Sequence, residues 1–225
     1  MKKKMKLMGM IMTGALLLAG STGMASSTGP GVTAGEALTK LMDGNKRYVE
    51  GKMSGTKMCD LEARQKLVAG QHPYAIILSC SDSRVPPELV FDEGLGEIFV
   101  VRVAGNVAAK GEVIGSVEYA AEHLGVPLVM VLGHEKCGAV KATVDSKGHA
   151  EGNIGTIVAD IAPALDKAKS PEPEDVADAN LDLVKKNLTA NSPILAKLVE
   201  EGKLKIVTGK YHIDNGDVVL KDELK

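Results

Sequence analysis

The chain has 225 residues, of which 44% are hydrophobic and 25% are charged, with a formal net charge of −2. This length and composition exclude a chain that is disordered throughout, and they allow one globular domain with a well-buried core.

The first 25 residues have the features of an export signal. Lysines at positions 2, 3, 4 and 6 precede an apolar run at 8–19, and small residues follow as far as Ala25. We predict a signal peptide at residues 1–25, cleaved after Ala25, which makes the protein exported (periplasmic or secreted) with no stable membrane anchor after cleavage. An uncleaved anchor is the alternative, although the run is short for a bilayer. Cleavage removes four lysines and no acids, so the net charge falls to −6 and nucleic acid is an unfavourable partner.

The residues after the signal divide into a leader and one domain. Residues 26–33 are rich in Gly, Ser and Thr, which predicts a flexible leader. We assign residues 34–225 to a single domain. Apolar residues recur at helical spacing over 37–48 and again over 61–68, so two helices are expected before the first strand.

Three continuous apolar runs predict strands that are buried on both faces of a parallel sheet. They lie at 74–78, 98–103 and 127–132. An apolar helical stripe at 113–124 joins the second run to the third, which predicts a β-α-β unit with a right-handed crossover.

The remaining chain continues the α/β pattern. Two mostly helical patterns are expected at 139–168 and 174–201. A fourth strand is expected at 204–208, and a turn at 214–217 leads into a short fifth strand at 218–220. The predicted fold class is α/β: a mostly parallel central sheet of four strands plus a C-terminal edge strand, flanked by helices, with the N-terminal helices extending from the domain.

Cysteine and histidine side chains follow two of the predicted strands. Cys80 comes directly after the first strand, His134 directly after the third, and Cys137 three residues later. Ligands of open parallel sheets bind beyond the carboxyl ends of the strands, so these residues can share one crevice. Two thiolates and one imidazole suit Zn²⁺, and three protein ligands leave a fourth position for water or substrate. The alternative is that all three are ordinary buried residues.

The segment after Cys80 is polar where the strand before it is apolar. Asp82 and Arg84 can form a charge-assisted pair at the strand exit, which leaves Asp82 near the metal as an acceptor. A surface ion pair in a plain turn is the alternative. We expect Cys137 to begin a helix, whose N-terminus favours the thiolate form.

Two sequence motifs carry a family resemblance. Cys-Ser-Asp-Ser-Arg-Val-Pro at 80–86 and Gly-His-Glu-Lys-Cys-Gly at 133–138 are similar to the two signatures of β-class carbonic anhydrases. The similarity runs from about Ala34 to Leu220 and includes shorter matches, at 70–73, 99–102, 104–106 and 116–119.

The resemblance implies a lyase that reversibly hydrates CO₂ to bicarbonate and a proton by zinc-bound hydroxide. It implies one Zn²⁺ per subunit on Cys80, His134 and Cys137, with Asp82 and Arg84 as the catalytic dyad. The substrate pocket of the plant-like branch of the family maps onto Gln71, Val85, Phe99, Tyr119 and Gly138. It also implies a homodimer that completes each site at the subunit boundary, with a tetramer as the larger alternative.

Several alternatives stay open on the sequence. In some relatives the dyad aspartate, which corresponds to Asp82, is the fourth zinc ligand of a closed state. Some of these relatives hold a regulatory bicarbonate beside a Trp and a Gly, and this chain has Ile77 and Ser79 at those positions. The difference favours an open, water-bound site. Other functions are a related zinc hydrolase, such as a carbon disulfide hydrolase, and a non-catalytic zinc-binding protein. His72 is the first candidate for a proton shuttle. Cys59 is interpreted as a free thiol outside the site, with an intermolecular disulfide as the alternative.

Overall fold

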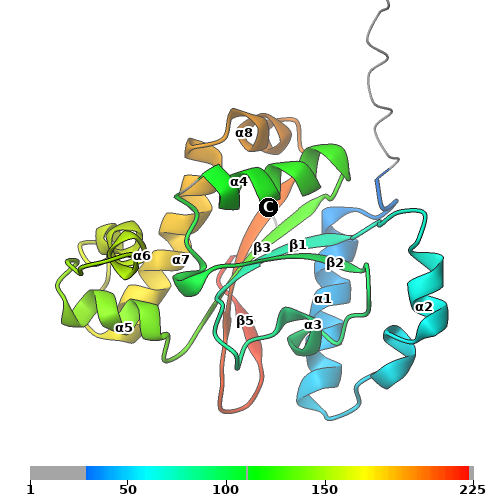
Figure 1. Cartoon of the computed structure of the whole chain (residues 1–225), viewed down its shortest axis with the longest axis horizontal. Helices are drawn as coiled ribbons and strands as arrows, with labels where there is room; N and C mark the ends of the chain where they lie inside the picture. Colours follow the sequence, from blue (N-terminus) through cyan, green and yellow to red (C-terminus); the bar gives the residue numbers. More distant parts are fainter. Residues whose placement is uncertain (1–28, 110, 223–225) are drawn as a thin grey trace, which may run out of the picture.

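The computed structural model describes residues 29–109 and 111–222, and its central element is a five-stranded sheet (Figure 1). The predicted signal peptide and residues 26–28 of the predicted leader lie outside the described residues. The strands are β1 (Ala75–Ser79), β2 (Ile98–Arg102), β3 (Leu128–His134), β4 (Lys205–Tyr211) and β5 (Val218–Leu220). Their order is β2-β1-β3-β4-β5; the first four are parallel and β5 pairs antiparallel with β4. The predicted fold class, four parallel strands plus an edge strand, is confirmed.

Helices connect the strands and cover both faces of the sheet (Figure 1). They are α1 (Ala34–Val49), α2 (Leu61–Lys66), α3 (Pro87–Val90), α4 (Gly111–Glu118), α5 (Gly138–Asp145), α6 (Ile154–Ile161), α7 (Pro173–Ala190) and α8 (Pro193–Glu200). A π-helical turn at Tyr119–His123 continues α4, and 3₁₀ turns lie at Gly55–Met58, Ala104–Asn106 and Ala162–Ala164. In the part of the chain that is described, no helix is long and apolar enough to cross a membrane.

Successive side chains of the central strands point to opposite faces, and each face has its own core. Ile76 and Leu78 of β1 belong to a cluster with α4, α7 and α8, whereas Ala75 and Ile77 pack with α1 and α3. All four side chains are completely buried, which explains why the strand has no polar alternation in the sequence.

Helix α1 lies against the sheet rather than extending from it. Thr33 caps its N-terminus in a capping box with Glu36. Near its C-terminus the buried amide of Asn45 donates to the carbonyls of Val90 and Gly216 and accepts from the backbone N–H of Val218. The N-terminal helices were expected to extend from the domain; α2, which has no buried residue, fits that expectation, but α1 does not.

Strand β3 is longer than its apolar run predicts. Gly133 and His134 were placed after the strand, but they pair with Lys210 and Tyr211 of β4. The reason is that β4 itself continues to Tyr211 and supplies partners as far as that residue. His134 is therefore held by the sheet rather than by a loop.

Candidate metal centre

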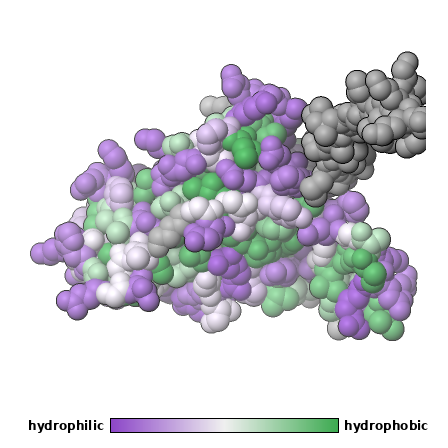
Figure 2. Space-filling view, turned by 45° about the horizontal axis from the view of Figure 1, so that its top comes forward, coloured by the Kyte–Doolittle hydropathy of each residue, from purple (hydrophilic) through white to green (hydrophobic). Residues whose placement is uncertain are grey.

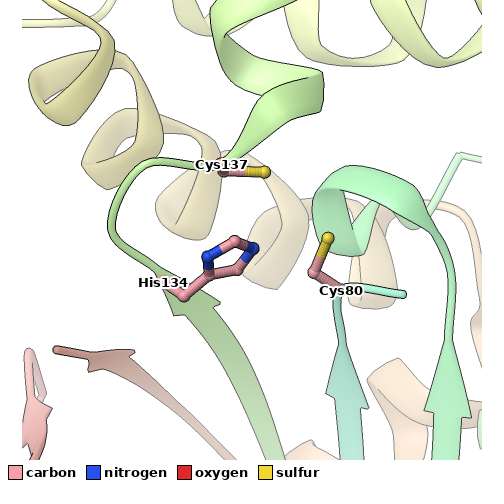
Figure 3. Close-up of side chains that lie close together, drawn as sticks. All are labelled: Cys80, His134 and Cys137. Carbon is pink, nitrogen blue, oxygen red and sulfur yellow. The ribbon is translucent and has the colours of Figure 1, made fainter. Parts of the chain in front are cut away.

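Three side chains converge at the carboxyl end of the sheet (Figure 3). Cys80 follows β1, His134 is the last residue of β3, and Cys137 is the N-cap residue of α5. One candidate ligand atom from each lies within 4.8 Å of the other two. All three residues are at least 96% buried. The predicted grouping of these residues is present because β1 and β3 are neighbouring parallel strands that end at the same edge.

The ring of His134 is oriented for metal binding. Its Nδ1 donates a hydrogen bond to the carbonyl of Glu135 at 2.8 Å. Its Nε2 is buried without a hydrogen-bond partner. An unpartnered buried imidazole nitrogen facing two sulfur atoms is costly unless a cation fills the space between them. The donor set therefore fits Zn²⁺, with the tautomer fixed by the carbonyl.

The pKa values of the Cys80 and Cys137 thiols are shifted in opposite directions. The neighbouring Cys137 thiol, and then the His134 ring and backbone N–H groups, lower the pKa of the Cys80 thiol against the effect of burial. The neighbouring Cys80 thiolate raises the pKa of Cys137. The backbone N–H groups of Ala139 and Val140, in the first turn of α5, act in the opposite direction and lower the pKa of Cys137, as expected of a helix N-terminus.

Asp82 and Arg84 form the pair that the sequence predicts. The guanidinium donates from Nε to Oδ1 at 2.9 Å and from Nη2 to Oδ2 at 2.7 Å. These bonds hold the pKa of Asp82 well below its usual range. Arg102, at the end of β2, donates to the carbonyls of Cys80 and Asp82 at 3.0 and 2.6 Å, which fixes the loop in front of the site. Asp82 Oδ2 lies 4.0 Å from His134 Nε2.

A backbone amide supports the first cysteine. The N–H of Gly105 donates to Cys80 Sγ at 3.3 Å. Gly105 has a φ of 71°, and an added Cβ would lie 2.6 Å from the side chain of Ile161. The buried Asn180 donates to the Gly105 carbonyl at 3.0 Å and so holds this turn in place. Such a donor stabilises the thiolate that a metal requires.

The five predicted pocket residues are not all gathered around the three ligands within one subunit. Phe99 on β2 pairs with Ile76 on β1. Ile76 lies four residues before Cys80, so Phe99 is displaced from the level of Cys80 by about 13 Å along the strand direction. Its ring contacts Tyr119, with 6.2 Å between ring centroids, and the Tyr119 side is open to solvent. Gln71 is exposed. Gly138 begins α5 directly after Cys137.

Val85 and His72 have separate environments. Val85 is completely buried and packs with the α1 side of the core, after a turn in which its N–H donates to the Asp82 carbonyl. His72, the first shuttle candidate, is exposed beside Gln71. A second imidazole, His123, lies 5.4 Å from the Tyr119 ring.

Some residues that shape the site were not singled out from the sequence. The Glu135 carbonyl is a backbone group, which leaves no signal in residue type, and the glycine at 105 indicates a special backbone conformation but not the hydrogen bond that its N–H makes. Arg102 did leave a signal: it is a charge at the end of an apolar strand, the same pattern that drew attention to Asp82 and Arg84.

A parallel sheet that delivers two cysteines and one histidine to one buried position, with the Asp82–Arg84 pair beside them, defines an α/β protein with a candidate metal centre whose ligand types suit zinc. Residues 75–218 match the family described as carbonic anhydrase. Carbonic anhydrase 2 of Mycobacterium tuberculosis is 37% identical over 190 residues, covering 82% of this chain and 91% of that protein. The carbonic anhydrase of Mycolicibacterium smegmatis is similar to the same extent.

Solved structures agree with these relatives. The β-carbonic anhydrase of Coccomyxa in complex with acetazolamide is 26% identical, with a TM-score of 0.66 over 83% of this chain and 86% of that one. The β-carbonic anhydrase CcaA is 26% identical, with a TM-score of 0.64 over 83% of this chain and 88% of that one. The chain belongs to the carbonic anhydrase family and to its β class.

Proposed function

We propose that this protein catalyses the reversible hydration of CO₂ to bicarbonate and a proton, using one Zn²⁺ per subunit held by Cys80, His134 and Cys137. The observation that carries the proposal is the convergence of these three buried side chains, with the ionised Asp82 held beside them by Arg84. Zinc, when bound, acidifies a water molecule and so supplies a nucleophile at neutral pH.

The residues around the metal have separate tasks. The Gly105 N–H stabilises negative charge on Cys80. Arg84 keeps Asp82 ionised and fixes its direction, so that Asp82 can accept a hydrogen bond from the attacking water and orient that water toward CO₂. Arg84 also donates to the Lys136 carbonyl at 3.2 Å, which ties the dyad to the loop between His134 and Cys137.

We propose further that the site is open, with solvent rather than Asp82 in the fourth position. Both carboxylate oxygens of Asp82 are engaged by Arg84, and Asp82 is not a member of the 4.8 Å ligand cluster. To coordinate zinc, Asp82 would have to give up at least one bond of a bidentate pair, which is among the stronger contacts a carboxylate makes.

A homodimer is proposed as the functional unit, with the partner subunit completing the pocket. Phe99 and Tyr119 form a ring pair whose Tyr119 side is 48% exposed, and Gln71 is exposed as well. Apolar side chains are exposed near α1 and α2, and Figure 2 shows apolar surface on that lobe at the lower right. Light scattering of the purified protein tests this: twice the subunit mass is expected, four times the mass indicates the tetramer, and a monomer contradicts the proposal.

Export is proposed on the basis of the N-terminal sequence alone. A basic start, an apolar run and a small-residue end at Ala25 support cleavage there. The mass of the protein recovered after expression with its full N-terminus tests the proposal. Loss of residues 1–25 is expected, and an intact N-terminus that stays with the membrane fraction supports the anchor instead.

A stopped-flow CO₂ hydration assay tests the proposed activity. Catalysis by the purified protein is expected to disappear when a strong chelator removes the metal and to return when Zn²⁺ is added back. Catalysis that survives complete metal removal, or a zinc-loaded protein that does not accelerate CO₂ hydration, would refute the proposed function.

A further inference from the structure

The loop that carries two of the three candidate ligands is anchored by a side-chain pair outside the site. Glu135 directly follows His134, and its carboxylate accepts a hydrogen bond from His212 Nδ1 at 2.8 Å. Its second oxygen accepts from the backbone N–H of Ile213 at 3.3 Å, and its own N–H donates to the Tyr211 carbonyl at 3.2 Å. The Glu135 peptide and side chain are therefore both bound to the end of β4.

The carbonyl of the same residue orients the histidine ligand. His134 Nδ1 donates to the Glu135 carbonyl at 2.8 Å, which selects the tautomer whose Nε2 is free for a metal. A carbonyl can only fix the ring if its own peptide plane is fixed. The contacts of the Glu135 side chain with His212 and Ile213 hold one end of that plane, and the Lys136 N–H at its other end donates to Glu174.

The next residue shows that the segment needs such constraints. Lys136 has a positive φ of 52°, which is an unfavourable conformation for a side chain other than Gly. Its N–H donates to Glu174 at 2.8 Å and its carbonyl accepts from Arg84 at 3.2 Å. The strained residue is thus fixed from two sides, and Glu135 is fixed by His212 and Ile213.

The Glu135–His212 pair is accessible but not loosely exposed: the two side chains are 24% and 30% exposed. Asp214 lies close to both, and the three side chains have potential metal-ligating atoms within 4.8 Å of one another. Because both oxygens of Glu135 are already engaged by donors of this chain, the arrangement is that of an anchor rather than of a second cation site.

We propose that Glu135 and His212 are positioning residues for the zinc ligand His134. The His212 hydrogen bond fixes the Glu135 side chain, the fixed peptide presents its carbonyl to His134 Nδ1, and the ring presents Nε2 to the metal. This inference rests on the proposed zinc site, but it adds two residues that act on the metal only through another residue.

Zinc affinity, measured by competition with a chromophoric chelator, tests the proposal. Outer partners of metal-ligating histidines change affinity by about 10–100-fold, and since the Glu135 carbonyl remains in every variant we expect about 10-fold weaker binding for His212→Ala and Glu135→Ala. His212→Asn places a neutral N–H donor at the position of Nδ1 and should restore near-normal affinity. His212→Gln places its donor at the position of Nε2 and should not. The matched control is Asp214→Asn, which removes a neighbouring charge without touching the anchor.

The absorption spectrum of the cobalt-substituted protein gives a second readout, independent of activity. Altered ligand-field and thiolate-to-cobalt bands are expected for the two alanine variants and for His212→Gln, and an unchanged spectrum for His212→Asn. Affinities of the alanine variants within twofold of the unaltered protein, or an Asn variant as impaired as the Ala variant, would overturn the proposal. If an alanine variant does not fold, the comparison of His212→Asn with His212→Gln decides. Failure of the unaltered protein to bind zinc would instead refute the proposed function.

Discussion

The guanidinium of Arg84 binds both carboxylate oxygens of Asp82 while it also donates to the carbonyl of Lys136, in the loop between two zinc-ligand candidates. One side chain thereby links the dyad to the metal loop. This arrangement depends on the planar, forked geometry of Arg, which Lys does not share.

Substitution of Arg84 should lower the rate of catalysis without releasing the metal. Arg84→Ala leaves Asp82 without its partner, so we expect CO₂ hydration to slow by about 100-fold or more, as when a single preorganised charge-stabilising donor is lost. Arg84→Lys should recover only part of this. Stopped-flow rates are the measurement, with zinc content determined in parallel. Lys141→Ala, which breaks the exposed Lys141–Asp145 pair, is the control. A rate for Arg84→Ala close to that of the control would contradict the assigned role.

Substitution of a ligand should remove the metal itself. Cys80→Ser replaces a thiolate by a hydroxyl that stays protonated, and we expect zinc affinity to fall more than about 100-fold, beyond the effect of losing an outer partner. Cys59→Ser is the matched control, because Cys59 lies outside the ligand cluster. Zinc content after dialysis measures both. Retention of stoichiometric zinc by Cys80→Ser would exclude this cysteine as a ligand.

Gly105→Ala tests the backbone donor to Cys80. Its positive φ disfavours any side chain, and the new methyl group would meet Ile161, so we expect about 1–2 kcal/mol less stability and weaker zinc binding. Gly115→Ala in α4 is the control, since an added Cβ there meets no atom within 4 Å and the residue is helical. Urea unfolding of the metal-free proteins gives the comparison. Equal free energies of unfolding for the two variants would contradict the claim that position 105 requires glycine.

Most of the sheet was predictable from the sequence because burial on both faces leaves a continuous apolar run, as in β1 and β3. The grouping of Cys80, His134 and Cys137 was predictable because ligand-type residues stand at the ends of neighbouring parallel strands. The anchor of Glu135 on His212 was not, since the two residues are separated by 77 positions and only the parallel pairing of β3 with β4 brings them together.

A buried acid outside the site gives a pH-dependent contribution to stability. Glu93 has a side chain only 1% exposed, 3.9 Å from Lys40 Nζ, and its carboxylate oxygens have no hydrogen-bond partner. Burial, and then the neighbouring Glu97, raise its pKa from 4.5 to about 8. The folded protein therefore binds more protons than the unfolded chain between these two values, and the stabilising contribution of Glu93 is lost as the pH rises from about 4.5 to about 8.

Glu93→Gln should remove this dependence. We expect the variant to gain about 1 kcal/mol or more relative to the unaltered protein between pH 5 and pH 8.5, because the amide cannot ionise. Urea unfolding at the two pH values gives the difference. Glu62→Gln, at an exposed position, should show no comparable change. A difference between Glu93→Gln and the unaltered protein that stays constant with pH would contradict the raised pKa.

The measurement that tests the central claim most directly is the initial rate of CO₂ hydration as metal-free protein is titrated with Zn²⁺. The rate should rise in proportion to the zinc bound and level off at one zinc per subunit, and Cys80→Ser should show no such rise. A rate that does not depend on bound zinc, or full zinc occupancy without catalysis, would contradict the assignment of Cys80, His134 and Cys137 as the metal centre of a carbonic anhydrase.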